Sequence, residues 1–273
     1  MPELPEVETV RRDVDALFTG RTIVDAAVGG PRTLRRHADP AAAVARLRGR
    51  RLESAGRRGK FLLLRLDSGE VAVVHLGMSG QLRVGEAGSP RQAHTHLVLT
   101  WDRGPELRFV DPRTFGQVWL TSAAVPELAH LGFEPLDEPI GWRGLEQRLA
   151  GRRTRIKPLL MDQRFVAGIG NIYSDEILWS AGVAHDREAG SLGGPEVQAV
   201  YRSMRSVLSA AVRLRGSSLA DEQYRDLAGR IGGYQLRHRV YGRDGLPCRR
   251  CGTPILRAKA YGRSTWYCPV CQH

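Results

Sequence analysis

The sequence predicts an α+β protein: an N-terminal antiparallel β-sandwich that begins with a helix, a helical second part and a small cysteine-rich C-terminal module. Three observations support this fold class. Short β-rich runs fill the chain up to about residue 120, helical periodicity follows, and all four cysteines lie in the last 26 residues. We therefore expect domains at residues 1–134, 135–235 and 236–273.

The first helix is predicted to start almost at residue 2. Its apolar residues recur at helical spacing, and Pro5 stands in the first turn, where a missing N–H costs nothing. These apolar residues are Leu4, Val7, Val10, Val14, Leu17 and Phe18.

The β-sandwich is predicted from short strands that turn residues separate. The clearest runs are FLLLRL (61–66), VAVVHLGM (71–78), HLVLTW (96–101) and QVWL (117–120). Strands this short, spaced this closely by Gly, Asp and Pro, are typical of antiparallel sheets packed face to face.

The second part is predicted to be helical after a loop at 132–141. The helical segments are WRGLEQRLAG, RIKPLLMDQ, NIYSDEILWSAG and PEVQAVYRSMRSVLSAAVRLRG, and glycines mark several of their ends. Residues 217–233 are rich in Gly, Ser and charge, so we expect a mobile loop that leads into the cysteine module.

The charge of the chain favours a polyanionic partner. Its 41 Lys and Arg residues outnumber 29 Asp and Glu, giving a formal charge of +12, so nucleic acid is the leading candidate. A basic surface that serves only solubility is the alternative. Because no apolar run is long enough to cross a membrane and the N-terminus is acidic, we expect a cytoplasmic protein.

The cysteines form two doublets with the spacing of a metal site. Cys248 and Cys251 form the first doublet, and Cys268 and Cys271 form the second after an intervening hairpin-length segment. Four thiolates complete the tetrahedral shell of one Zn²⁺, which would therefore be structural. Two disulfides or four free thiols are the alternative.

The segment between the doublets combines positive charge with aromatic rings. Arg257, Lys259 and Arg263 alternate with Tyr261, Trp266 and Tyr267 on a predicted hairpin. Such a finger suits phosphate binding, whereas a charged run without a metal is usually only a solvated face.

The N-terminus MPELPEVETVRR indicates amine chemistry. If Met1 is removed, Pro2 presents a secondary amine at the positive end of a helix dipole, which favours the neutral, nucleophilic form. Glu3 can donate a proton, and Glu6 can bind the amine or free N–H groups. Alternatively, these acids only complement the helix dipole.

At this point the sequence resembles the bacterial formamidopyrimidine-DNA glycosylase family over nearly its whole length. The matching motifs, in family order, are MPELPEVETVRR, RRGKFLLL, HLGMSGQL, DPRTFG, IKPLLMD, GIGNIYSDE, VYGRDGLPC and CGTPI…GRSTWYCPVCQ. The resemblance implies a β-sandwich with the first helix, a helix-two-turn-helix domain and a zinc finger, with DNA held between the halves.

The resemblance also implies residue roles. Pro2 would form the Schiff base, Glu3 would be the catalytic acid with Glu6 in support, and Lys60 would donate a proton and contact DNA near the lesion. Asn171 and Arg263 would bind phosphates of the same DNA backbone, and Arg263 would also donate a proton in δ-elimination. From sequence alone, Lys60 could instead guard a strand edge, and Asn171 could be a plain helix cap.

A trio of residues would fill the space that a flipped base leaves. Met78, Arg113 and Phe115 match this family trio, although isolated Met and Phe residues are more often core residues. Thr114 departs from the commoner double-Arg form of DPRTFG but leaves the assignment intact. Further DNA contacts are expected at His75, His94 and Lys157, and His75 could equally be a core histidine.

The expected function is removal of 8-oxoguanine and formamidopyrimidines from double-stranded DNA, followed by β,δ-elimination at the abasic site, by a monomeric enzyme. The related endonuclease VIII type, which prefers oxidised pyrimidines, is the alternative enzyme. A catalytically silent DNA-damage binder and a zinc-ribbon RNA-binding factor are the alternatives from other classes. Residues 217–233 are the candidate loop for holding the flipped base.

Overall fold

The computed structural model describes residues 1–137, 140–219 and 223–273, and these divide into two compact units. The first unit contains residues 1–129 and 214–233, and the second contains residues 130–213 and 234–273. Below, "first unit" and "second unit" refer to these two sets of residues.

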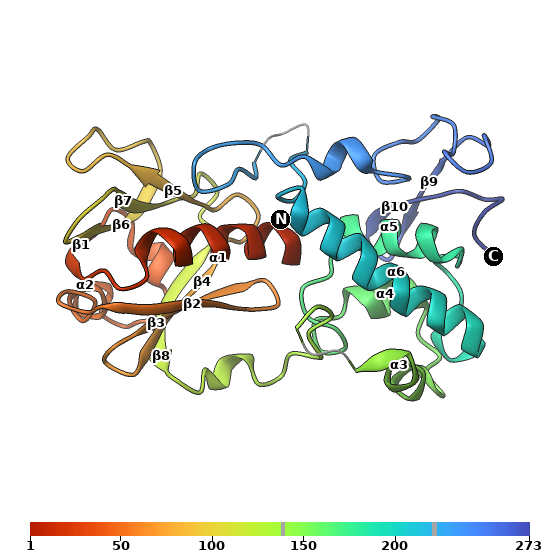
Figure 1. Ribbon diagram of the computed structural model, residues 1–273, viewed down its shortest axis with the longest axis horizontal. Coiled ribbons are helices and arrows are strands. Elements are labelled where there is room, and N and C mark those ends of the chain that lie inside the picture. Colours follow the sequence, from red (N-terminus) through yellow and green to blue (C-terminus); the bar gives the residue numbers. More distant parts are fainter. Residues whose placement is uncertain (138–139, 220–222) are drawn as a thin grey trace. The chain divides into compact units, whose positions relative to one another are not determined.

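The first unit contains the predicted pair of antiparallel β-sheets (Figure 1). One sheet has the order β1 (Ile23–Val28), β6 (Thr95–Trp101), β7 (Glu106–Val110) and β5 (Gln81–Gly85). The other has the order β2 (Leu52–Arg58), β3 (Phe61–Leu66), β4 (Glu70–His75) and β8 (Gln117–Ser122). Side chains from both sheets join one apolar core, so the sandwich prediction is confirmed.

Helix α1 (Leu4–Phe18) packs Val7, Val10, Val14 and Phe18 into this core, as their spacing predicts, whereas Leu17 is exposed. The ring of Phe18 stacks on Trp101 of β6, with the ring centroids 4.8 Å apart. Short helices complete the unit: α2 (Pro40–Ala45) and the 3-10 turns Pro31–Leu34 and Pro126–Leu128. The start of α1 is thus fixed by buried contacts farther along the same helix.

The second unit is helical and carries a terminal hairpin, again as predicted. Its helices are α3 (Gly141–Leu149), α4 (Ile156–Met161), α5 (Asn171–Ala181) and α6 (Gly194–Arg213), with 3-10 turns at Ala189–Ser191 and Tyr234–Arg237. Strands β9 (Leu256–Ala260) and β10 (Arg263–Tyr267) pair in the antiparallel hairpin between the cysteine doublets. In the part of the chain that the structure describes, the helices lack the length and apolarity needed to span a membrane.

Residues 214–233 return to the first unit after α6. Tyr224 and Leu227 are buried in the sandwich core, and the N–H of Val84 on the edge strand β5 donates to the Leu227 carbonyl at 3.0 Å. The predicted loop is irregular, but these residues are anchored in a core. Residues 220–222 of the predicted lesion-holding loop lie outside the described residues.

Candidate functional site

The N-terminal residues Pro2 and Glu3 are buried at the start of α1. The carboxylate of Glu6 organises them: Oε2 accepts the Glu3 N–H at 2.8 Å, and Oε1 accepts the Ser217 N–H at 2.7 Å. A Cβ atom on Gly216 would lie 2.6 Å from Oε1, so this approach requires glycine. Glu6 therefore joins the candidate nucleophile to residues 214–233, a role that sequence analysis gave only as support.

Lys60 lies in the tight turn between β2 and β3 and is 5% exposed. The end of β2 is tied to α1 because the Glu8 carboxylate accepts from Arg57 Nε at 3.2 Å. Although burial opposes it, hydrogen bonds from Arg11 and Arg12 lower the pKa of Glu8. This ionised carboxylate holds the Lys60 turn and the first helix in one framework.

His75 ends β4, beside the Lys60 strand pair. Its ring centroid lies 4.7 Å from that of Phe61. Burial, together with the positive charges of Lys60, Arg36 and Arg35, lowers the pKa of His75 to about 4. His75 is therefore neutral near pH 7, so any phosphate contact would be a hydrogen bond without a full charge.

The three candidate void-filling side chains project from two turns of the first unit that pack backbone against backbone. Met78 and Phe115 are each 43% exposed, and Arg113 is exposed with its guanidinium 5.0 Å from the Phe115 ring centre. A Cβ atom on Gly77 would lie 2.6 Å from the Gly116 nitrogen. This contact holds the two turns together while their large side chains stay at the surface. These side chains are therefore not core residues.

The backbone of this region contains two residues with positive φ that are not glycine. Thr114 has φ 55°, which is strained for a β-branched side chain, and His94 has φ 62°. The His94 carbonyl accepts the Asp111 N–H at 3.0 Å. The exposed His94 therefore lies beside the turn that carries Arg113.

Asn171 and Arg263 come close through the zinc-module hairpin of the second unit. Asn171 begins α5, and its Nδ2 donates to the carbonyl of Ser264 at 3.0 Å. Arg263 precedes Ser264 at the start of β10 and is exposed. The side chain of Asn171 is thus bonded to the backbone next to Arg263, which connects the two candidate phosphate ligands.

Lys157 is 1% exposed, so its ammonium is inside the second unit. Its Nζ lies 2.7 Å from Asp175 Oδ1 and donates to Thr265 Oγ1 at 2.8 Å. Asp175 Oδ2 accepts the Trp266 N–H at 3.1 Å, and burial raises the pKa of Asp175 to about 7 although Lys157 opposes it. The pair therefore fastens α4 and α5 to β10, which carries the candidate phosphate ligand.

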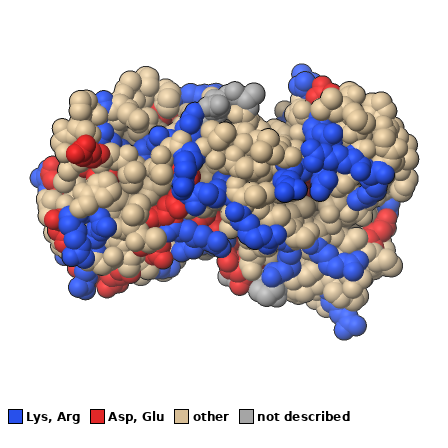
Figure 2. Space-filling view, turned by 45° about the horizontal axis from the view of Figure 1, so that its top comes forward, with Lys and Arg blue, Asp and Glu red and all other residues tan. Residues whose placement is uncertain are grey.

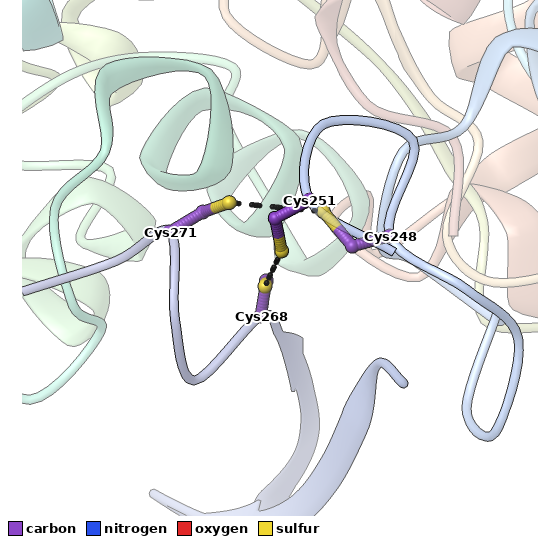
Figure 3. Close-up of side chains that lie close together, drawn as sticks. All are labelled: Cys248, Cys251, Cys268 and Cys271. Carbon is purple, nitrogen blue, oxygen red and sulfur yellow. Dashed lines mark hydrogen bonds between the residues drawn. The ribbon is translucent and has the colours of Figure 1, made fainter. Parts of the chain in front are cut away.

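The four cysteines converge on one point, with their sulfur atoms within 4.8 Å of one another (Figure 3). Cys248 and Cys268 are buried, and Trp179 Nε1 and the Arg250 N–H both donate to Cys248 Sγ at 3.4 Å. Four thiol donors with such N–H support fit one tetrahedral Zn²⁺. The group is a structural zinc site, and its closed ligand set leaves no position for substrate.

Positive charge is concentrated in the same module. Residues 235–273 contain eight Lys and Arg residues and one Asp, a formal charge of +7 before the metal and its thiolates are counted. Figure 2 shows Lys and Arg side chains gathered on the visible face of the second unit. This surface suits the phosphates of a nucleic acid.

Two buried acids of α5 make structural contacts that the sequence did not predict. Asp175 forms the pair described above, and Glu176 accepts the N–H groups of Arg239, Val240 and Tyr241 at 2.9–3.0 Å. The signal that could have found them is their position inside the apolar pattern of NIYSDEILW, where ionised side chains need partners.

Family models match the chain in three consecutive segments. Residues 1–118 match the formamidopyrimidine-DNA glycosylase N-terminal domain, residues 131–223 match its H2TH domain, and residues 245–273 match a zinc finger found in FPG and IleRS. A β-sandwich, a helix-two-turn-helix domain and a zinc finger in this order define a class of DNA-repair glycosylases.

Individual relatives agree over full length. The formamidopyrimidine-DNA glycosylase of Herpetosiphon aurantiacus is 43% identical, with all of both chains covered. The crystal structure of MutM (FPG) from Thermus thermophilus has a TM-score of 0.88 at 42% identity, covering 99% of this chain and 98% of that one. The Lactococcus lactis Fpg complex with abasic-site DNA has a TM-score of 0.92 at 33% identity, covering 99% of each. The chain belongs to the formamidopyrimidine-DNA glycosylase family and is a DNA glycosylase of base-excision repair.

Proposed function

We propose that this chain excises 8-oxoguanine and formamidopyrimidines from duplex DNA through a Schiff base on Pro2 and then cleaves the abasic site by β,δ-elimination. The observation that carries the proposal is the buried Pro2–Glu3 start of α1, held by Glu6, in a chain that matches the family from end to end. Related Lactococcus lactis complexes contain Fapy-dG or abasic-site DNA.

The first half of the reaction needs an amine and an acid. Once Met1 is removed, the Pro2 nitrogen attacks C1′ and the bond from C1′ to the damaged base breaks, and the proton lost from the Pro2 N–H goes to the departing base. Glu3 gives a proton to the sugar ring oxygen as its bond to C1′ opens, which leaves an iminium between Pro2 and C1′. Glu6 keeps Glu3 in place through the Glu3 N–H.

The second half removes both phosphates. Loss of a C2′ proton from the iminium breaks the C3′–O bond, and a second elimination breaks the C5′–O bond. Lys60 and Arg263 are the assigned proton donors and phosphate contacts for these departures. Water then hydrolyses the iminium and releases the Pro2 amine.

Binding is assigned to two groups of residues. Asn171, Arg263 and Lys60 would bind phosphates, with weaker contributions from His75 and His94, while Met78, Arg113 and Phe115 would replace the flipped base. Lys157 is expected from the sequence to contact DNA, but its ammonium is buried against Asp175, so the role proposed for it here is to support the hairpin. The domain boundaries at 134 and 235 and an association with the bacterial nucleoid are part of the same proposal.

A second substrate class has specific support. One Lactococcus lactis Fpg complex contains DNA with an oxidised pyrimidine, so some activity on such lesions is expected beside the preferred purines. The silent-binder alternative would require Pro2 to be blocked, and mass spectrometry of the N-terminus tests that directly.

The decisive experiment is borohydride trapping on a duplex with one 8-oxoguanine opposite cytosine, followed by peptide mapping of the cross-link. We expect the cross-link at Pro2, impaired base removal and lyase chemistry with Pro2→Gly, and mainly loss of base removal with Glu3→Gln. If only a preformed abasic duplex traps, the substrate shifts toward oxidised pyrimidines. If neither duplex traps, the chain is a binder and the proposed chemistry is wrong.

A further inference from the structure

The turn DPRTFG (111–116) is held on both sides of its backbone by charged side chains. Two of its exposed residues, Arg113 and Phe115, are candidates for entering the DNA, yet neither side chain anchors the turn in the core. The anchoring falls instead to a buried acid within the turn and to an arginine about 80 residues earlier in the chain.

The carboxylate of Asp111 holds the N–H side of the turn. Asp111 is fully buried, Oδ1 accepts the Arg113 N–H at 3.2 Å, and Oδ2 accepts the Gly116 N–H at 2.7 Å. Ser79 Oγ donates to Oδ1 at 2.5 Å and in turn accepts the Arg113 N–H at 3.3 Å. A buried carboxylate with this many donors is fixed in position and fixes the turn around it.

The guanidinium of Arg35 holds the carbonyl side. Its Nη1 donates to the Gly116 carbonyl at 2.9 Å, and its Nη2 donates to the Phe115 carbonyl at 3.0 Å. The planar fork of an arginine suits two adjacent acceptors of this kind. Arg35 also donates to the Arg32 carbonyl at 3.0 Å, which orients it on its own turn.

The same clamp reaches the turn that carries Met78. Ser79, which donates to Asp111, follows Met78 directly in the chain. Gly77 on the other side of Met78 packs against the Phe115–Gly116 backbone. Any shift of the 111–116 backbone therefore moves all three candidate void-filling side chains together.

We propose that Arg35 and Asp111 are positioning residues that set Arg113, Phe115 and Met78 for insertion into the DNA at the flipped base. The proposal rests on the function proposed above. Neither residue reaches the reacting sugar in this assignment; they order the wedge before DNA arrives. Insertion of these side chains must offset part of the free energy needed to flip a base. If the side chains are ordered before DNA binds, no binding free energy is spent on ordering them.

The test uses Arg35→Ala, because Arg35 is exposed and its replacement should not unfold the protein. Arg32→Ala is the matched control, because it removes a like charge from the short 3-10 turn that Arg35 caps. Arg35→Lys keeps the charge but not the two-pronged geometry. Ser79→Ala tests the Asp111 side without removing the buried carboxylate.

Three quantities are measured in each variant. These are the melting temperature, hydrogen–deuterium exchange of the peptide containing residues 111–117 without DNA, and single-turnover excision of 8-oxoguanine opposite cytosine and opposite adenine. The exchange readout does not depend on activity, so it separates failure of this inference from failure of the proposed function.

For Arg35→Ala we expect an unchanged melting temperature, faster exchange at Gly116, and at least ten-fold slower excision opposite cytosine. The family resemblance implies that Arg113 pairs with the cytosine that the flipped base leaves unpaired. Any preference for cytosine over adenine should therefore shrink in Arg35→Ala, because the turn would no longer hold Arg113 in place. Arg35→Lys should be intermediate, and Ser79→Ala should show a smaller change of the same kind.

Two outcomes overturn the inference. The first is an Arg35→Ala variant with exchange and opposite-base preference equal to those of Arg32→Ala. The second is faster exchange at 111–117 with excision rate and preference unchanged, since the turn would then be ordered for no functional reason.

Discussion

The two proposed DNA-contacting regions are stabilised in different ways. In the first unit, the turn that carries the exposed residues Arg113 and Phe115 depends on a backbone N–H that donates to Asp111 and on a backbone carbonyl that accepts from Arg35. In the second unit, Asn171 and Arg263 depend on a buried ion pair and on four cysteine ligands. Local backbone hydrogen bonds can be lost one at a time, whereas a buried charge or a metal cannot lose one partner cheaply.

The largest expected effect on DNA binding comes from removing a zinc ligand in the second unit. Cys268→Ser removes a fully buried ligand, and because a structural Zn²⁺ contributes about 10–16 kcal/mol of binding free energy, the hairpin should lose its fold. We expect loss of zinc and a fall in DNA affinity of about 100-fold or more, measured by metal analysis and fluorescence anisotropy.

Pro269→Ala is the control for this change, because Pro269 is exposed between the ligands Cys268 and Cys271. A Cys268→Ser protein that lacks zinc but binds DNA normally would show that the hairpin does not need its metal. The sandwich core of the first unit should persist in the variant.

The next effect comes from the buried pair. Asp175→Leu leaves the Lys157 ammonium without its carboxylate and should cost about 3–5 kcal/mol in urea unfolding. Lys157→Met should cost less, because burial already raises the pKa of Asp175 to about 7 and the lone carboxyl can become neutral. The double variant should recover much of the loss; if it is no more stable than Asp175→Leu, the charges are not the cause.

The smallest expected effect is on the pH dependence of stability, and it compares a buried histidine in each unit. The folded pKa of His75 is about 4, below its ordinary value, so the unfolded chain binds the extra proton first as the solution is acidified. His75 therefore contributes stability above about pH 6.5 that is lost as the pH falls toward 4, by up to about 3 kcal/mol.

His75→Gln should flatten this part of the stability profile measured by thermal unfolding. His238 of the second unit has a similarly lowered pKa of about 4, so His238→Gln is the matched control in the other unit. An unchanged acid limb in His75→Gln would contradict the buried, neutral state of that histidine.

Sequence patterns predicted the features that depend on spacing. The doublets at Cys248 and Cys268 led to the metal module, and helical or β-rich periodicity led to the two kinds of unit, both of which are confirmed. The family motifs placed Arg113 and Phe115, which the structure shows to be exposed, although their roles remain a proposal.

Features that depend on tertiary contacts could not be predicted in this way. Arg35 lies in a polar stretch with no periodic signal, and it meets the 114–116 carbonyls only because the fold brings its turn to β8. Lys157 reads as a surface cation in IKPLLMD, and only the partner Asp175 on the next helix explains its burial. In both cases the partner is too distant in sequence for local patterns to reveal it.

The close backbone contacts at Gly77 and Gly216 have a consequence for mutational tolerance. Gly77 lies against the Phe115–Gly116 backbone and Gly216 against the Glu6 carboxylate, each with a positive φ and no room for a methyl group. In a random mutagenesis screen, inactivating changes should therefore cluster at these glycines, which make no assigned contact with DNA. In a deep mutational scan of this chain, substitutions at these supporting glycines should reduce activity as clearly as substitutions at the reactive residues.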